Sequence, residues 1–377
     1  MGRAVTRSGR LHVLHVVVQA GPTNSQWNEH CLPMADQHVI TVCSLLPSTV
    51  APDPRIRRYD GSGSRLGALR VLRSALRSGG YDVVHVHAPS SAALLLGVAA
   101  LGRRRMDDVV FTLHNSWPNL RRRNRLLAAL AMAVIPTSVA CSTSAADSIP
   151  GWVHRFARRP VQVVTNGVDV QRVLKAGEEA PPAPSADAGR TVVSIGRLIP
   201  IKDQATLLTA FAKASRPGDR LVVIGDGPLR GDLERLAGRL GVADRVELPG
   251  LLPRDEVYRV LAGADAYVST SRGEGLPLSV LEALAAELPV VLSDIPPHQE
   301  VAAATAAARL VPVGDTRAFA DALTRLLALP LEQREALGRS ARKAVTDAFS
   351  VHSMTHGYAR IYASLRRGDR QPIGAAA

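Results

Sequence analysis

The chain has 377 residues, which is enough for two domains of ordinary size. Hydrophobic residues make up 46% of it and exclude a disordered chain, while aromatic residues make up only 4%, so Val, Leu and Ala must fill the cores. The net charge is +13, and residues 1–180 carry nearly all of it, with 22 Lys and Arg against 11 Asp and Glu. Such an excess points to an anionic membrane, a nucleic acid or an acidic substrate, although solvated Arg-rich helix faces explain it equally well.

Three features of the sequence bear on the cellular compartment of the protein. No hydrophobic run reaches the roughly 20 residues of a membrane-spanning helix. The N-terminus is basic and then apolar like a signal peptide, but His12 and His15 interrupt the apolar run, so a first β-strand is the better interpretation. Cys31, Cys43 and Cys141 are odd in number and far apart, which predicts reduced, buried thiols in a cytoplasmic protein.

Short Val- and Ile-rich segments alternate with longer helical segments along the chain. In the first half we expect strands at 11–18, 39–43, 82–87, 109–113, 138–141 and 161–164, with helices that include 65–78 and 92–102. After a segment rich in Pro, Ala and acidic residues at 175–189, the pattern resumes with strands at 191–195, 221–224, 246–248, 266–269, 290–292 and 310–313, with helices that include 204–214 and 230–240. The last helical stretch is expected at 331–367, followed by a loose tail at 374–377.

Apolar strands separated by crossover helices predict an α/β fold of two doubly wound parallel-sheet domains. We place the first domain at 1–175, a linker at 176–189 and the second domain at 190–351. Two such domains facing each other would form a cleft, and ligands of doubly wound sheets bind beyond the carboxyl ends of the strands. The chemistry is therefore expected on loops that follow strands.

The most informative of these loops places two carboxylates, Glu274 and Glu282, eight positions apart around a helix start. Gly275 lets the backbone approach a ligand, and Pro277 suits the first helical position. The free N–H groups of that helix end form an anion site, and Glu282 lies among apolar residues, where a charge needs a partner. A nucleotide sugar would satisfy all of these groups. A helix with two solvated glutamates, Glu282 and Glu287, is an equally weighted alternative.

Another loop follows the expected strand at 191–195. Its Gly196 opens a turn, Arg197 and Lys202 are cations suited to a diphosphate, and Asp203 is a plausible N-cap of the next helix. The glycines at 225–231 have the wrong spacing for a dinucleotide fingerprint and predict a tight turn instead. The chain has neither a P-loop nor an Asp-x-Asp pair. No cluster has metal-ligand spacing along the sequence, so we expect no metal and no cofactor.

Histidines lie in or directly after two of the expected strands of the first half. His114 ends the expected strand at 109–113, where it could donate to a sugar hydroxyl or to a leaving oxygen, or simply cap the loop. His85 and His87 alternate with valines and are expected in or near the sheet. No Ser-His-Asp or Cys-His arrangement is present in the sequence.

Taken together and in order, these segments resemble family 4 of the retaining glycosyltransferases, whose fold is the two-Rossmann-domain glycosyltransferase B fold. The resemblance runs through most of the chain, and its most specific part is the family's E-x7-E motif at Glu274 and Glu282. The segments that carry it are HVVVQAGP, YDVVHVHAP, VFTLHN, TNGVD, SIGRLIPIKD, LVVIGDGPLR, VELPGLLPRDEV and SRGEGLPLSVLEALAAELPVVLSD.

The resemblance implies roles for the matching residues. Arg197 and Lys202 would neutralise the donor pyrophosphate, Glu274 would hold sugar hydroxyls, and Glu282 would bind the ribose diol. Other donor contacts would come from Gly21, the backbone near Leu252, the loop Gly275, Leu276 and Pro277, and His114 near the donor sugar. The family's reaction retains configuration and needs no metal, and domain closure would assemble the site. The C-terminal helix, about 352–370, would pack back on the first domain.

One departure concerns the first loop, where many members of the family have a Gly-Gly pair. Here only Gly21 is available, and the longer polar loop that follows, 22–30, puts the phosphate contacts of the first domain in doubt. Trp27 could stack on a sugar, but packing of the loop by its own Trp is at least as plausible.

The sequence thus predicts a metal-independent, retaining transfer of a hexosyl-type sugar from a UDP- or GDP-sugar to a glycan, lipid-linked or small-molecule hydroxyl. No nucleic acid is expected, and the basic first domain suggests peripheral contact with an anionic membrane at its inner face. The alternatives are a nucleotide-sugar 2-epimerase of the same fold and a non-catalytic basic protein that binds sugar or nucleic acid.

Overall fold

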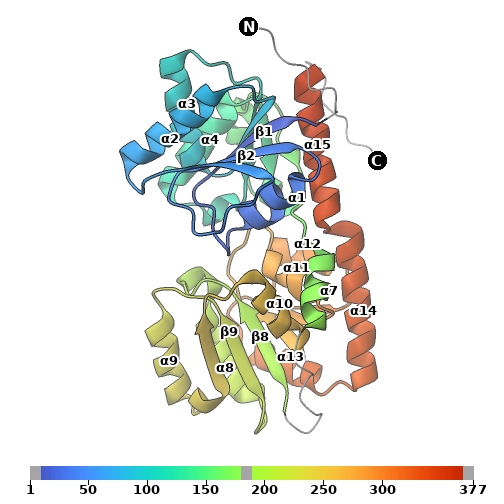
Figure 1. Ribbon diagram of the computed structural model, residues 1–377. Coiled ribbons are helices and arrows are strands. Elements are labelled where there is room, and N and C mark those ends of the chain that lie inside the picture. The colour runs from blue at the N-terminus through green and yellow to red at the C-terminus, as the bar shows by residue number, and fades with distance from the viewer. Residues whose placement is uncertain (1–9, 180–188, 368–377) are drawn as a thin grey trace. The chain divides into compact units, whose positions relative to one another are not determined.

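The computed structural model describes residues 10–179 and 189–367, which form two compact units (Figure 1). Among the described residues, the first unit comprises 10–141, 145–164 and 352–367, and the second comprises 142–144, 165–179 and 189–351. Each unit is built on one parallel β-sheet. The α/β class and the two doubly wound sheets predicted from the alternating pattern are confirmed.

The sheet of the first unit has the strand order β3-β2-β1-β4-β5-β6-β7, and every neighbouring pair is parallel. Its central strands are buried along their whole length, because helices cover both faces. The strands are β1 (His12–Val17), β2 (Val39–Ser44), β3 (Ile56–Asp60), β4 (Val83–Val86), β5 (Val109–Leu113), β6 (Thr137–Ala140) and β7 (Gln162–Val163).

The helices of the first unit include three that lie side by side, namely α2 (Arg65–Ser78), α3 (Pro89–Gly102) and α4 (Arg122–Val134) (Figure 1). The Ser64 hydroxyl caps α2 by accepting from the Gly67 amide. The remaining short elements are η1 (Gln26–Cys31), α1 (Leu32–Met34), η2 (Trp117–Asn119), α5 (Thr143–Asp147) and α6 (Gly151–Phe156).

The sheet of the second unit has the order β10-β9-β8-β11-β12-β13, again parallel throughout. Its strands are β8 (Thr191–Ile195), β9 (Arg220–Ile224), β10 (Val246–Gly250), β11 (Ala266–Ser269), β12 (Val290–Ser293) and β13 (Ala308–Val311). Its helices are α7 (Val170–Glu178), η3 (Pro200–Lys202), α8 (Gln204–Ala214), α9 (Arg230–Arg239), η4 (Ala243–Arg245), α10 (Arg254–Ala262), α11 (Leu278–Ala285), α12 (Pro296–Ala302), α13 (Thr316–Leu327) and α14 (Leu331–Ala348). In both sheets, the loops at the carboxyl ends of the strands carry the polar residues discussed below.

The structure departs from the predicted elements in several places. The edge strand β3 was missed because its sequence, IRRYD, is mostly polar, and only its first residue is fully buried. The expected loop at 22–30 contains a π-helix, η1, and β13 lies two residues earlier than expected. The helical stretch at 331–367 is two helices, α14 and α15 (Val351–Arg367). Helix α7 runs to Glu178, while linker residues 180–188 and the tail at 374–377 lie outside the described residues.

Candidate functional site

The clearest polar feature of the second unit is an ion pair at the carboxyl ends of two neighbouring strands. Lys202 ends η3, which follows β8, and Glu274 lies between β11 and α11. The Lys202 Nζ atom lies 2.5 Å from Glu274 Oε1, and the two side chains are only 19% and 12% exposed. Burial raises the pKa of Glu274, but the adjacent Lys202 ammonium outweighs it and holds that pKa below its ordinary value. The Glu274 carboxylate is therefore ionised at neutral pH.

The loop that carries Lys202 packs tightly against the next loop of the sheet. The Leu198 amide donates to the Asp226 carbonyl over 3.0 Å, and a Cβ at Gly225 would lie 2.1 Å from the Gly196 carbonyl oxygen. Gly225 also has a φ of 141°, which suits glycine alone. The glycine segment after β9 is thus a tight turn that supports the neighbouring loop, as its spacing predicted. The Arg197 side chain is exposed in this loop.

Asp203 occupies the N-cap position of α8, but its side chain does not cap the helix. Its carboxylate instead accepts from the Thr206 hydroxyl over 3.0 Å and pairs with Arg272 Nη2 at 2.7 Å. Its backbone is left-handed, with φ 49° and ψ 42°, so the carboxylate is directed away from the helix amides. The predicted capping role is therefore wrong, and Asp203 joins the loop after β8 to the loop after β11.

Helix α11, which follows Glu274 and contains Glu282, begins at Leu278, one residue later than predicted. Pro277 is therefore its N-cap and not its first residue. The N-cap offers no side-chain hydrogen bond to the first turn. Gly275, Leu276 and Pro277 are buried in the segment that leads into it. The Val280 amide donates to the Pro277 carbonyl over 3.0 Å, so the Leu278 and Ser279 amides are the ones of the first turn suited to an anion.

Glu282 is a buried carboxylate of α11, with 2% of its side chain exposed. Its Oε1 lies 3.2 Å from Arg254 Nη1 and accepts from the Tyr258 hydroxyl over 3.4 Å. Both partners belong to α10, so a cation and a phenol offset the burial of this charge. The alternative of a solvated glutamate is wrong for Glu282, whereas Glu287, 35% exposed, pairs with Arg342 at 3.0 Å.

Sequence reasoning missed several polar neighbours of these glutamates. Arg254 and Tyr258 hold Glu282, and Tyr267 is a buried phenol whose hydroxyl lies 2.9 Å from Ser279 Oγ. His298 is fully buried, and its Nδ1 lies 2.8 Å from the Ser293 carbonyl oxygen. Arg254 lies in VELPGLLPRDEV, one of the segments that carry the family resemblance, whereas Tyr258, Tyr267 and His298 lie in none of those segments, so no local pattern marked them. Leu252, predicted to lie near the base, is half-buried in the loop after β10.

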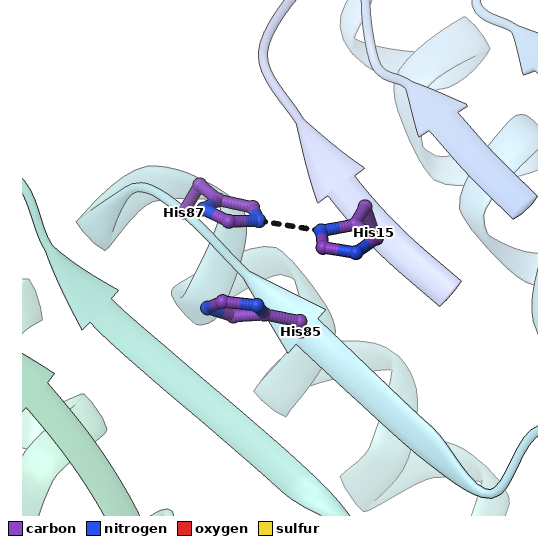
Figure 2. Close-up of side chains that lie close together, drawn as sticks. All are labelled: His15, His85 and His87. Atoms are coloured by element: carbon purple, nitrogen blue, oxygen red, sulfur yellow. Dashed lines mark hydrogen bonds between the residues drawn. The ribbon is translucent and has the colours of Figure 1, made fainter. Parts of the chain in front are cut away.

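The first unit presents histidines at the carboxyl edge of its sheet. His114, half-exposed, directly follows β5, and its Nε2 lies 3.0 Å from His87 Nδ1. His87 Nε2 in turn lies 2.8 Å from His15 Nδ1 (Figure 2). The imidazoles of His114, His87 and His15 therefore form a hydrogen-bonded row. Burial lowers the pKa of His114 to about 4 and that of His15 to about 3. All three rings are neutral at physiological pH, because burial also holds the pKa of His87 well below its ordinary value.

One tyrosine of α15 hydrogen-bonds His85, which the sequence placed in or near the sheet, and a second bonds the threonine beside it. Its Nδ1 lies 2.6 Å from the Tyr362 hydroxyl, and its Nε2 lies 2.7 Å from Thr112 Oγ1. Tyr358 bonds the same threonine at 3.1 Å. The C-terminal helix is therefore tied to β4 and β5 by a buried polar network.

Gly21 lies in the turn after β1, where its carbonyl accepts from the Asn24 amide over 3.0 Å. It is buried, and a Cβ there would lie 3.2 Å from Thr49 Oγ1. The following residues enter η1, in which Trp27 is only 5% exposed. The Trp27 ring therefore packs within its own unit and offers little surface for stacking on a sugar.

The polar groups at the sheets of the two units suit different ligands. In the second unit, Lys202 and the start of α11 suit an oxyanion, while Glu274 and Glu282 suit hydroxyl donors. In the first unit, neutral imidazoles can donate or accept single hydrogen bonds.

Two protein-family models match the chain. A model described as Glycosyltransferase Family 4 matches residues 27–172, and a model described as Glycosyl transferases group 1 matches residues 178–344. Between them they take in His30, His85, His87 and His114 of the first unit, but not His15, and both glutamates of the second. These matches favour a transferase over the epimerase and binding-protein alternatives.

Individual relatives agree with the family models. The chain is 31% identical over 219 residues to the lipopolysaccharide core biosynthesis glycosyltransferase LpsE of Rhizobium meliloti, a match that covers 57% of this chain and 62% of that relative. It is 27% identical over 280 residues to a phosphatidyl-myo-inositol mannosyltransferase of Mycobacterium leprae, covering 71% of each protein. The first of these matches thus spans less than two thirds of the relative's length.

Solved structures share the fold at low sequence identity. Sucrose-phosphate synthase of Thermosynechococcus elongatus aligns with a TM-score of 0.80 and 17% identity, over 96% of this chain and all of that one. HepE of Anabaena, solved in complex with UDP-glucose, aligns with a TM-score of 0.74 and 19% identity, over 94% of this chain and all of that one. These similarities establish the fold.

Proposed function

Because the chain belongs to the family 4 glycosyltransferases, we propose that it moves a hexosyl sugar from a nucleoside-diphosphate sugar to an acceptor hydroxyl, with retention of configuration and without a metal. The observation that carries the proposal is the buried Lys202–Glu274 pair beside the free N-terminus of α11. An ammonium, a carboxylate and a row of amide donors in one place match a sugar diphosphate, which has both anionic oxygens and hydroxyls.

The donor would engage the second unit through several groups. Its diphosphate would lie between Lys202, Arg197 and the first turn of α11, and the ammonium can serve a phosphate while keeping Glu274, because it has three donors. Glu274 would accept from hydroxyls of the transferred sugar. Glu282, held by Arg254, would accept from the ribose diol. Backbone near Leu252 would contact the base.

The reaction follows from where charge develops. As the bond between the anomeric carbon and the diphosphate oxygen breaks, its electron pair goes to that oxygen, and Lys202, Arg197 and the α11 amides stabilise the new charge. The acceptor oxygen attacks the same face of the sugar, and its proton passes to the departing phosphate. His114 would donate from a neutral ring to a sugar hydroxyl, since its pKa of about 4 keeps it unprotonated.

The acceptor is proposed to be a glycan, a lipid-linked glycan or a small molecule, and a surface of the first unit favours one at a membrane. Helices α4 and α6 pack together and leave four large apolar side chains open, 49–69% exposed: Leu126, Leu130, Trp152 and Phe156. Exposed arginines flank them at Arg121, Arg122, Arg123 and Arg155. Apolar side chains ringed by cations suit an anionic lipid surface. No helix within 10–179 or 189–367 has the length and apolarity to cross a bilayer.

The donor proposal is tested by thermal unfolding of the protein with UDP, GDP, ADP and their sugars, in buffer without metal. A ligand of the native state raises the unfolding temperature. We expect a rise with one nucleotide family, and its loss in Glu282→Ala. The matched control is Glu287→Ala, because Glu287 is half-exposed and pairs with Arg342 outside the proposed site. No rise with any nucleotide, or an equal rise in both variants, would overturn the assignment.

The membrane proposal is tested by sedimentation with anionic and neutral vesicles. We expect binding to anionic vesicles that weakens with salt and with Trp152→Ser together with Phe156→Ser. Leu331→Ser, which changes an equally exposed leucine of the second unit, is the control. Binding unaffected by salt and by the double substitution would contradict the proposal.

A further inference from the structure

Five histidines of the first unit gather at the carboxyl edge of its sheet, although they come from four separate segments. His15 lies on β1, His30 on η1, His85 and His87 on and just after β4, and His114 just after β5. Four of them are at most 5% exposed. Two sets of three have ligand atoms within 4.8 Å of one another: His15, His85 and His87, and His30, His87 and His114.

The first set is poorly arranged for a metal ion. Figure 2 shows the His85 ring lying alongside the other two rings, and its centroid is 3.9 Å from that of His87. Imidazoles that bind one tetrahedral ion have ring centroids about 5 Å apart. The 3.9 Å between the centroids of His85 and His87, whose planes are tilted by 35°, is too short for two ligands of the same ion. Both nitrogens of His85 are also engaged, with Tyr362 and Thr112. This set is therefore a packed polar core.

The second set has the spacing that a tetrahedral ion needs. With metal–nitrogen bonds of about 2 Å and tetrahedral angles, three imidazoles on one zinc have their ring centroids about 5 Å apart. The centroid separations here are 5.1 Å for His30 and His87, 5.2 Å for His30 and His114, and 5.3 Å for His87 and His114. Moreover, the buried Nδ1 of His30 has no hydrogen-bond partner.

We propose that His30, His87 and His114 form a binding site for a borderline transition-metal ion such as Zn²⁺. The ion takes the place of the proton that His87 Nδ1 and His114 Nε2 share across 3.0 Å, and His30 supplies the third nitrogen. Three nitrogens leave the fourth position of a tetrahedral ion to water. Imidazole ligands favour Zn²⁺ and Co²⁺ over Mg²⁺ or Ca²⁺.

The surroundings support this site. His87 keeps its second nitrogen on His15 Nδ1, the outer hydrogen bond that orients metal-bound imidazoles. Burial keeps the rings uncharged, so an ion displaces few protons on binding. His114 is the least buried of the three ligands. The π-helix η1 carries His30 toward the other two, and such helices recur at functional sites.

The ion would regulate the enzyme and not serve the reaction. An ion on His114 fixes that ring and removes it from the donor sugar, so occupancy inhibits transfer. This consequence rests on the proposed function, whereas binding of the ion does not.

Binding is tested with Co²⁺ on the purified full chain, because tetrahedral Co²⁺ has strong visible absorption. We expect stoichiometric absorption that Zn²⁺ abolishes by displacement, and at least a tenfold loss of affinity in His30→Asn and in His87→Asn. His15→Asn should weaken binding about 10–100-fold as an outer partner. His85→Asn and the exposed-histidine control His352→Asn should retain it.

Several outcomes would overturn the site. They are no tetrahedral absorption in the wild type, absorption that survives His30→Asn, or absorption lost in His85→Asn while that variant unfolds at the wild-type temperature. Thermal unfolding of every variant separates loss of a ligand from loss of the fold.

The regulatory consequence is tested by zinc titration of sugar transfer, in which His30→Asn should need at least tenfold more zinc for the same inhibition. Equal sensitivity would overturn it. A protein that binds Co²⁺ but transfers no sugar would leave the site standing and refute the proposed function instead.

Discussion

In the first unit, the polar groups at the carboxyl edge of the sheet are imidazoles that burial keeps uncharged. In the second unit they are ion pairs, Lys202 with Glu274 and Arg254 with Glu282, buried to a similar degree. The two sheets have the same parallel architecture, so the fold does not dictate this difference. It follows from which residues the loops supply.

The difference shows which unit can keep charged side chains in a buried site. A buried ion pair keeps its charges because each partner offsets the desolvation of the other, so it can receive an anion. A cluster of imidazoles without a carboxylate partner loses its protons instead. We therefore assign anion binding to the second unit, and metal binding and neutral hydrogen bonding to the first.

The largest expected effect is the acid sensitivity of the histidine cluster. Burial holds the pKa values of His15, His30, His85, His87 and His114 below 6.5, so the unfolded chain binds protons that the folded chain does not. The free energy of unfolding should fall as pH drops from about 6.5 toward 4, by up to about 1.4 kcal/mol per pH unit for each histidine. Urea unfolding at pH 7.5, 6.5 and 5.5 measures this, and constant stability across that range would show that the cluster is not neutral.

The second unit should be most sensitive to loss of its cation. Lys202→Met removes the cation beside the Glu274 carboxylate and a donor to the leaving phosphate, so kcat should fall about 10²–10³-fold. Steady-state transfer kinetics measure it, with Lys213→Met as the control, since Lys213 is exposed on α8. A loss below tenfold would mean that Lys202 only supports the fold.

A smaller effect should come from the tyrosine that holds the cluster. Tyr362→Phe leaves His85 Nδ1 without its 2.6 Å partner and should lower the free energy of unfolding by about 1–3 kcal/mol. The matched control is Tyr59→Phe, because the buried Tyr59 hydroxyl has no hydrogen-bond partner to lose. Urea unfolding compares the two, and equal losses would argue against a specific role for the His85 bond.

The smallest effect is expected at a pair of the second unit in which Asp203 is 12% exposed but Arg272 is largely open to solvent. Arg272 is 52% exposed and lies 2.7 Å from Asp203, so Arg272→Ala should change the free energy of unfolding by less than about 1 kcal/mol. The change should shrink further in high salt. A large loss in the free energy of unfolding that does not depend on salt would contradict this and would show that the pair behaves like a buried ion pair.

The central strands and the loops that follow them could be predicted from the sequence, because each depends on residues that are neighbours along the chain. Runs of apolar residues predicted the central strands, since a strand buried on both faces needs them continuously. The edge strand β3 and the π-helix η1 were not predicted. The sequence of β3, IRRYD, lacks such a run, and a π-helix has no simple repeat of apolar residues. The site residues remain predictions of role, although the structure gives each its position.

The sequence by itself determined the α/β class, the two sheets and the loops on which polar chemistry would lie. Only the tertiary structure decided the partners: Arg254 for Glu282, Tyr362 for His85, and His30 for His87 and His114. His15 and His87 are 72 positions apart, and His85 and Tyr362 are 277 apart. Such pairs arise because parallel strands bring their carboxyl ends to one edge whatever their order in the chain, which no local pattern encodes.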